Sequence, residues 1–301
     1  MMASRMLTMP GAFRQSEASQ RVSRGRWNPR SATPAAWLGV GIVIALALIA
    51  AIGPMLTGDP DKQVLRDRLL PPVFFGGTWD HPLGTDQLGR DLLARAVVGC
   101  RLTLLLSLAV TVASTVMGSL LGLIGGLRPG RIDGALRFLV DVQIALPVIV
   151  IAIAASVLFA PGFVLVFLVL LSTGWISYQR VVRLQTRSLS QAQFVEASRS
   201  IGAGEGWIVR RHLLPNLAGT IAVLATQQMA AVILFEAALS YLGLGMPADA
   251  ITWGRMVADG RESMLNAWWV SVIPGLCIAL AVLGFNLIGE WFGTRRPGVA
   301  S

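Results

Sequence analysis

The sequence is poor in lysine, histidine and cysteine, and each scarcity argues against a class of site. Lys62 is the only lysine among 301 residues, so the chain lacks the Gly-Lys-Ser/Thr sequence that holds nucleotide phosphates in a P-loop. Cys100 and Cys277 are isolated, in or beside apolar segments, and we expect small buried side chains rather than a disulfide or metal ligands. His81 and His212 both fall outside the apolar runs, which argues against an enzyme site within a membrane. We therefore expect this chain to bind no metal or cofactor itself.

Charged residues are also scarce, at 14% of the chain against 54% apolar residues. Several apolar runs are long enough to cross a bilayer, which indicates an integral membrane protein rather than a soluble domain. We predict an all-α fold, a polytopic transmembrane helix bundle. Its six expected spans cover residues 35–56, 102–127, 139–159, 163–178, 219–242 and 267–292. Pro147 falls inside the third span and is expected to kink it.

The segments outside the spans differ in composition. Residues 1–34 contain six arginines and one acidic residue with no apolar period, which predicts a disordered basic tail. This tail is too long for the n-region of a signal peptide, and the run at 35–56 is long enough to span a bilayer, so it is expected to be an uncleaved first span. Residues 57–101 are expected to form an external loop and pre-helix segment, 102–292 a core of five transmembrane helices, and 293–301 a second tail.

The loop at 57–101 contains His81, Asp86 and Asp91, three residue types that can bind metals. Their spacing is irregular and no second histidine is near, so a structural role is favoured. Thr85 or Asp86 is expected to cap the helix that follows.

The arginines predict the orientation of the bundle. The two tails and the stretches 128–137 and 180–211 hold 17 of the 25 Lys and Arg residues, and the remaining segments hold 8. Because positive residues concentrate on the cytoplasmic side, both termini are expected in the cytoplasm. The net charge of +9 is thereby explained by topology, and nucleic-acid binding is not expected.

Two glycine patterns predict local geometry. Gly118, Gly122 and Gly126 recur at every fourth position of the second span, so they share one helix face on which a neighbouring helix can pack closely. In the stretch 190–216, Gly202-Ala203-Gly204 separates two helix-forming pieces, 191–200 and 205–213, and glycine permits a tight turn. Pro215 is expected to mark the boundary at which the fifth span begins.

The same stretch carries a recognisable spacing. Glu196-Ala197-Ser198 is followed by Gly202 six positions after the Glu, and by Leu214-Pro215 eighteen and nineteen positions after it. This resembles the EAA loop of ABC importer permeases. The wider chain is similar to the peptide/nickel-type permease family, in particular the C-type subunit of dipeptide and oligopeptide transporters, in the segments HPLGTDQLGRD, DVQIALP, RRHLLPN, EAALSYLGLG, TWGRMVADGR and AWWVSVIPGL.

The resemblance implies a type I ABC importer permease fold in the bacterial inner membrane. Implied partners are a homologous B-type permease, two ABC ATPase subunits that carry ATP and Mg, an extracytoplasmic solute-binding protein and a peptide substrate. The cytoplasmic helix-turn-helix would dock in a groove of the ATPase, whose closure would rock the transmembrane helices.

The resemblance also implies roles for residues in the loop. Glu196 would contact or orient toward the ATPase, Ile201 and Trp207 would be apolar plugs, and Arg210 and Arg211 ion-pair partners. Two residues depart from the common pattern: Ser198 replaces the second alanine, and His212 stands where many permeases have an apolar residue. Without the resemblance, the loop reads as an amphipathic helix with snorkelling arginines at the membrane surface.

Polar residues inside spans are costly, so they are expected either to bond between helices or to line the translocation path. They are Asp141, Gln143, Gln227, Gln228, Glu236, Asn286 and Glu290. The spans carry no His or Met cluster or thiol pair for a soft metal ion, which favours peptides over the alternatives of nickel, metal chelates or glutathione. An ion-coupled secondary transporter is the alternative from another class, but no internal repeat supports it.

Overall fold

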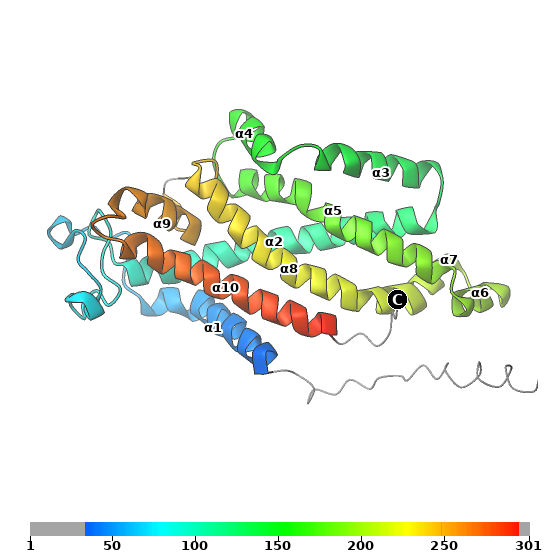
Figure 1. The fold of residues 1–301 in the computed structure, drawn as a ribbon, viewed down its shortest axis with the longest axis horizontal. Helices are drawn as coiled ribbons and strands as arrows, with labels where there is room; N and C mark the ends of the chain where they lie inside the picture. Colours follow the sequence, from blue (N-terminus) through cyan, green and yellow to red (C-terminus); the bar gives the residue numbers. More distant parts are fainter. Residues whose placement is uncertain (1–33, 248, 295–301) are drawn as a thin grey trace, which may run out of the picture.

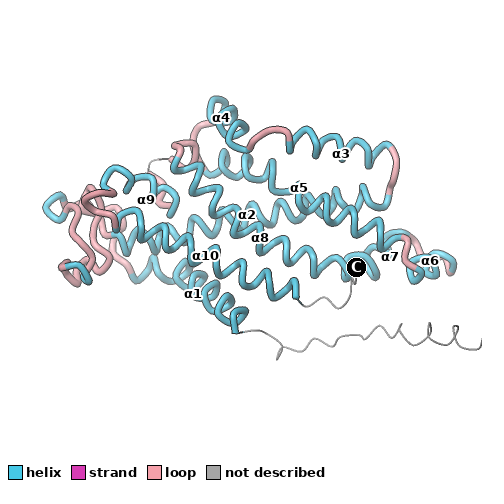
Figure 2. Tube along the Cα trace, in the orientation of Figure 1, coloured by secondary structure: helices cyan, strands magenta, loops and turns pink. Residues whose placement is uncertain are grey.

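The computed structural model describes residues 34–247 and 249–294, which form an elongated bundle of helices (Figure 1). The long helices are α1 (Pro34–Leu56), α2 (Leu92–Leu127), α5 (Phe163–Ser190), α8 (Leu214–Tyr241) and α10 (Trp269–Thr294). Loops gather at the ends of the bundle, with the stretch 57–91 beside α9 (Trp253–Gly260) at one end and α6 (Gln193–Ser200) at the other (Figure 2). The predicted helical fold class is confirmed.

Five helices within the described residues are long and apolar enough to cross a membrane. Two differ clearly from the expected bounds. α2 begins at Leu92, well before residue 102, so the preceding loop ends at Asp91. α5 continues to Ser190, past the expected end at 178. The extension of α5 adds polar helical turns beyond the apolar run, and that of α2 carries two arginines, Arg95 and Arg101, among apolar residues.

The third expected span, 139–159, is wrong as a single helix. The chain forms α3 (Arg131–Ile144) and α4 (Val148–Leu158), which are bent by 86° relative to each other. Pro147 lies at the break, where it lacks an N–H and disfavours helical geometry in the preceding residue. At about 1.5 Å per residue, neither helix alone spans a hydrocarbon core of about 30 Å.

The glycine face of α2 packs against α5, as predicted. A Cβ at Gly122 would lie 2.9 Å from the Gln179 carbonyl oxygen, and one at Gly126 would lie 2.6 Å from the Thr186 Cβ. Such distances are too short for a side chain, so the two helices approach each other along this face because it has none.

Short polar contacts fix α9 against the end of the bundle. The buried Trp253 indole donates to the Ala96 carbonyl oxygen at 2.8 Å, and Thr252 caps α9 by accepting from the Arg255 N–H at 3.1 Å. The Trp269 indole, at the start of α10, donates to the Thr85 carbonyl oxygen at 3.3 Å. These bonds join α9 and α10 to α2 and to the loop before it.

The loop before α2 uses its acidic residues for structure. Asp91, and neither Thr85 nor Asp86, is the N-cap of α2, where its carboxylate accepts from the Ala94 N–H at 2.8 Å. Asp91 also lies 3.1 Å from the His81 Nδ1. Asp86 instead closes the turn ahead of the helix, accepting from the Arg90 guanidinium at 2.6 Å. The expected caps were wrong by five or six residues because several cap-forming residues lie close together here.

Candidate coupling site

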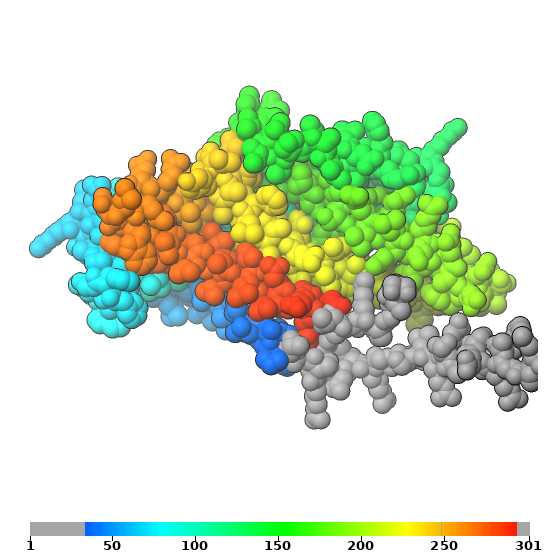
Figure 3. All heavy atoms as spheres, viewed as in Figure 1, coloured from blue at the N-terminus to red at the C-terminus, as the bar shows by residue number. Residues whose placement is uncertain are grey.

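The stretch 193–213 forms a bent segment at one end of the bundle, which we call the elbow. It consists of α6, α7 (Glu205–Ile208) and a π-helical turn, Val209–Leu213, that leads directly into α8. In the space-filling view the elbow protrudes from the end of the molecule (Figure 3). The two helical pieces expected from the sequence are therefore present, the second of them split between α-helical and π-helical geometry.

Gly202 sets the bend after α6. Its φ of +86° is left-handed, its N–H donates to the Arg199 carbonyl at 2.9 Å, and the Ala203 N–H donates to the Ser198 carbonyl at 3.0 Å. This pair of bonds is the Schellman motif, which favours glycine at this position. Gly204, by contrast, has an ordinary φ of −70°. Of positions 202 and 204, only position 202 therefore requires glycine for its backbone conformation.

Apolar side chains fasten the elbow to the bundle. Val195, Ile208 and Leu213 are buried in a cluster that includes Val182 of α5 and Leu217 of α8. The elbow is therefore packed onto the ends of two long helices and cannot shift without displacing them.

The residues expected to meet the ATPase lie on the other face of the elbow. Ile201 is 83% exposed and Trp207 51% exposed, and Glu196 is exposed in the first turn of α6. Arg210 and Arg211 are exposed too. The solvent face also contains Ala197 and Phe194, and Phe194 was not anticipated from the sequence. The roles of these residues remain predictions, and the structure places them on one outward-facing element.

His212 joins the two arms of the elbow. Its ring lies 5.4 Å from that of Phe194 on α6 and 5.1 Å from that of Trp207 on α7, between ring centroids. Its Nε2 lies 3.3 Å from the Ser198 Oγ, which itself donates to the Phe194 carbonyl at 2.8 Å. The two departures from the common family pattern thus contact each other, which sequence spacing alone did not indicate.

We expect His212→Ala to loosen α6 by about 1–2 kcal/mol, because each aromatic contact contributes about 0.5–1.5 kcal/mol. Faster amide hydrogen exchange across residues 193–200 would report this loss. Arg211→Ala, at an exposed neighbour, is the matched control. Equal exchange in the two variants would contradict a bracing role for His212.

Pro215 marks the start of α8, as expected, but it does not interrupt the helical path. It lies in the first turn of α8, and the helical path runs from Glu205 to Tyr241 without a break. Proline lacks an N–H, and its ring clashes with the carbonyl four residues earlier in a regular α-helix. The π-helical turn Val209–Leu213 directly before Pro215 widens the helix at this point, which accommodates the ring.

The polar residues of the spans fall into separate groups. Gln227 of α8 and Asn286 and Glu290 of α10 line a common groove of about 400 Å³. Gln228 is half-buried and faces α5, where a Cβ at Gly174 would lie 2.6 Å from its Nε2.

The remaining polar residues lie elsewhere. On α3, Asp141 is exposed and Gln143 is half-buried, away from the groove between α8 and α10. Glu236 lines neither region: it is 1% exposed and accepts from Ser240 and Thr252, each at 2.8 Å. It therefore ties α8 to the start of α9, which is the first of the two alternatives expected for the polar residues of the spans.

An ion pair between α3 and α5 escaped the sequence analysis. Asp133, at the start of α3, binds the Arg183 guanidinium of α5 through two nitrogens, with the Nη2 to Oδ2 contact at 2.9 Å. Both side chains are largely buried. The pair holds α3 to α5 close to the elbow, although the two residues are far apart in the chain.

Residues 118–296 match the profile of the family described as binding-protein-dependent transport system inner membrane component. The chain belongs to this family. A second match, over residues 31–72, is to the N-terminal TM domain of oligopeptide transport permease C. This chain is thus a multi-pass membrane protein and a permease subunit. The resemblance found in the sequence is confirmed.

Curated relatives align with most of the length of this chain. It is 33% identical over 266 residues to the dipeptide transport system permease protein DppC of Bacillus subtilis, covering 88% of this chain and 82% of the relative. It is 34% identical over 253 residues to the oligopeptide transport system permease protein OppC of Escherichia coli, covering 83% and 82%.

A solved structure shares the fold. A chain of the MetNI methionine ABC transporter, in an inward-facing conformation, matches with a TM-score of 0.54 at 20% identity, covering 65% of this chain and 93% of that one. This chain therefore has the fold of an ABC importer permease.

Proposed function

We propose that this chain is the C-type permease subunit of an ATP-driven importer of short peptides. The observation that carries the proposal is the similarity to DppC and OppC over more than four fifths of the chain. Its partners would be a homologous B-type permease, two ABC ATPase subunits and an extracytoplasmic binding protein. The ATPases would bind ATP and Mg, and this chain would have no catalytic site of its own.

The elbow is the part of the chain best suited to receive force from an ATPase. It carries Glu196, Ile201 and Trp207 on an outward face, while its inward face is packed into α5 and α8. The excess of arginine at 128–137 and 180–211 supports a cytoplasmic position for this end, with both termini on the same side. Closure of the ATPases would then tilt the elbow and the helices fastened to it together.

The groove between α8 and α10 is the proposed lining of the translocation path. Gln227, Asn286 and Glu290 supply amide and carboxylate groups to it. Such groups can bond peptide amides and a terminal ammonium, and polar groups within a membrane region commonly mark a transport pathway.

The test is uptake of trialanine into proteoliposomes that contain the chain, the B-type permease and the two ATPase subunits, with the binding protein supplied outside. Uptake should require ATP. Glu196→Ala is expected to reduce it several-fold, whereas Glu205→Ala, at an exposed residue of the same elbow, should leave it near the wild-type rate. Uptake driven by a proton gradient without ATP would contradict the proposal.

Gly202→Ala adds a conformational test of the elbow. No atom lies within 4 Å of a Cβ built at this position, so the cost is the left-handed backbone alone, about 1–2 kcal/mol. ATP-driven uptake should fall with this variant. Gly204→Ala, also in open space but with φ of −70°, is the matched control and should transport normally.

A further inference from the structure

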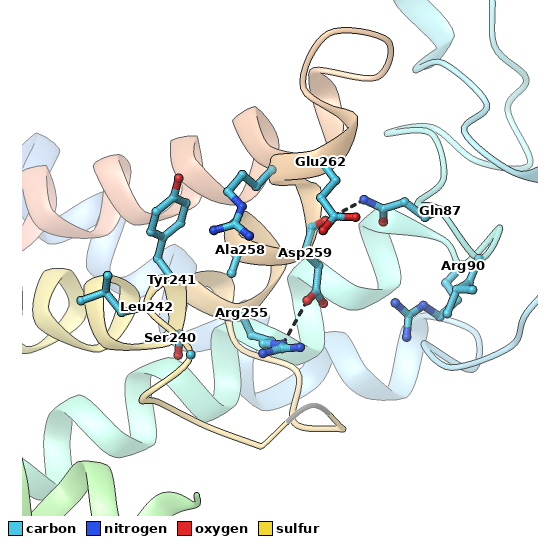
Figure 4. Close-up of a pocket in the computed structure, with 12 residues that line it drawn as sticks. Gln87, Arg90, Ser240, Tyr241, Leu242, Arg255, Ala258, Asp259 and Glu262 are labelled. Carbon is cyan, nitrogen blue, oxygen red and sulfur yellow. Dashed lines mark hydrogen bonds and ion pairs between the residues drawn. The ribbon is translucent and has the colours of Figure 1, made fainter. Parts of the chain in front are cut away.

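A cavity of about 600 Å³ lies beside α9, at the end of the bundle opposite the elbow (Figure 1). Figure 4 shows side chains that line it. Its walls are the C-terminal end of α8, the outer face of α9 and the loop at 87–90. This volume lies within the range of sites that enclose small molecules. Charged and polar side chains line much of it, including Arg90, Tyr241, Arg255, Asp259, Arg261 and Glu262.

The floor of the cavity is neutralised by its own ion pairs. The Arg90 Nε lies 2.6 Å from the Asp86 Oδ2, and the Arg255 Nε lies 3.0 Å from the Asp259 Oδ1. Burial raises the pKa of the Asp259 carboxyl, and neighbouring guanidiniums, Arg255 first among them, oppose this rise. The Gln87 side chain donates to the Asp259 carbonyl oxygen at 2.7 Å and holds the loop against α9.

The rim carries one charge of each sign. Arg261 and Glu262 are consecutive residues just after α9, and both are exposed. Within residues 34–247 and 249–294, neither forms an ion pair. The Arg261 guanidinium lies over the Tyr241 ring, 5.6 Å from its centroid, which orients the cation toward the cavity wall formed by α8.

We propose that this cavity receives the charged ends of a short peptide, with Arg261 binding the terminal carboxylate and Glu262 the terminal ammonium. The inference rests on the proposed function and names a subsite for its substrate. A zwitterionic ligand matches a neutral floor with one cation and one anion at the rim, whereas a simple anion would leave Glu262 facing like charge.

The cavity is joined mechanically to the elbow. Ser240 and Tyr241, which form part of its wall, end the continuous helix that begins at Glu205. Ser240 also donates to the buried Glu236, which accepts in turn from Thr252 at the start of α9. A peptide that bridges α8 and the end of α9 therefore contacts the helix whose other end carries the elbow.

Equilibrium binding to the complete membrane assembly in nanodiscs, without the binding protein, tests the proposal. The probes are trialanine, trialanine amide and N-acetyl-trialanine, measured by isothermal titration. Arg261→Gln should weaken trialanine binding about tenfold and leave the affinity for the amide unchanged, because the amide lacks the carboxylate. Glu262→Gln should also weaken trialanine binding about tenfold. It should leave the affinity for N-acetyl-trialanine unchanged, because that peptide lacks the terminal ammonium. Arg66→Gln, at an exposed arginine outside the cavity, is the control.

Two outcomes would overturn the inference. One is that the unsubstituted assembly shows no saturable trialanine binding. The other is that Arg261→Gln slows uptake with the binding protein present but leaves trialanine affinity unchanged, since the arginine would then contact the binding protein. Either outcome is compatible with ATP-driven uptake by the unsubstituted transporter, whereas failure of that uptake would count against the proposed function instead.

Discussion

Replacing Asp133 with alanine is expected to lower the stability of the permease by about 3–5 kcal/mol, because it leaves a buried guanidinium without its carboxylate. The Arg183 side chain is only 13% exposed and that of Asp133 is 3% exposed. Thermal unfolding of the purified permease in detergent measures the effect. Asp133→Leu combined with Arg183→Met should recover most of the loss, since paired apolar groups remove the uncompensated charge.

Arg137→Ala is the matched control for this substitution. Its Nη2 lies 3.4 Å from the same Asp133 carboxylate, but its side chain is 56% exposed. An exposed ion pair contributes at most about 1 kcal/mol, so the control should unfold close to the wild-type temperature. If the Asp133 and Arg137 variants unfolded at the same temperature, the buried pair would not be a principal link between α3 and α5.

Replacing Gly122 with leucine is the second substitution with a large expected effect. Even a Cβ there would lie 2.9 Å from the Gln179 carbonyl oxygen and 2.9 Å from the Val182 Cβ, and a backbone carbonyl cannot move aside without moving α5. Overpacking of this kind costs about 1–3 kcal/mol or more. We expect a lower unfolding temperature and reduced assembly with the partner subunits.

Gly41→Leu provides the comparison for Gly122→Leu. Gly41 is also inside a membrane-spanning helix, α1, but no atom lies within 4 Å of a Cβ built on it. Both variants change helix propensity equally, so their difference reports packing alone. Equal unfolding temperatures and equal assembly would mean that α2 and α5 do not depend on close approach.

Features governed by local periodicity were predictable from the sequence. The apolar runs located the long helices, and the four-residue spacing of Gly118, Gly122 and Gly126 located a packing face before its partner helix was known. Spacing around Glu196 and Gly202 located the elbow. Each prediction depends on neighbours within a few helical turns, where sequence distance and spatial distance agree.

Features that depend on tertiary neighbours were not predictable in this way. The Asp133 and Arg183 side chains meet only because α3 folds back along α5. Pro147 predicted a kink in the third span, but not its division into two helices bent by 86°. The sequence left open whether Glu236 bonds between helices or lines the path, and only the structure shows that Ser240 and Thr252 donate to its carboxylate. The contacts of His212 with Phe194 and Trp207 form only because the bend at Gly202 brings α6 and α7 together.

The unbroken helix from Glu205 to Tyr241 acts geometrically as a lever. It contains 37 residues, so at about 1.5 Å per residue it is about 55 Å long. A tilt of about 5° about one end moves the other by about 5 Å, roughly one helical turn. The π-helical turn before Pro215 therefore has a mechanical consequence, because it keeps the helix from Glu205 to Tyr241 continuous. A small rotation at the elbow is enlarged at the far end of α8 and is not absorbed by a proline hinge.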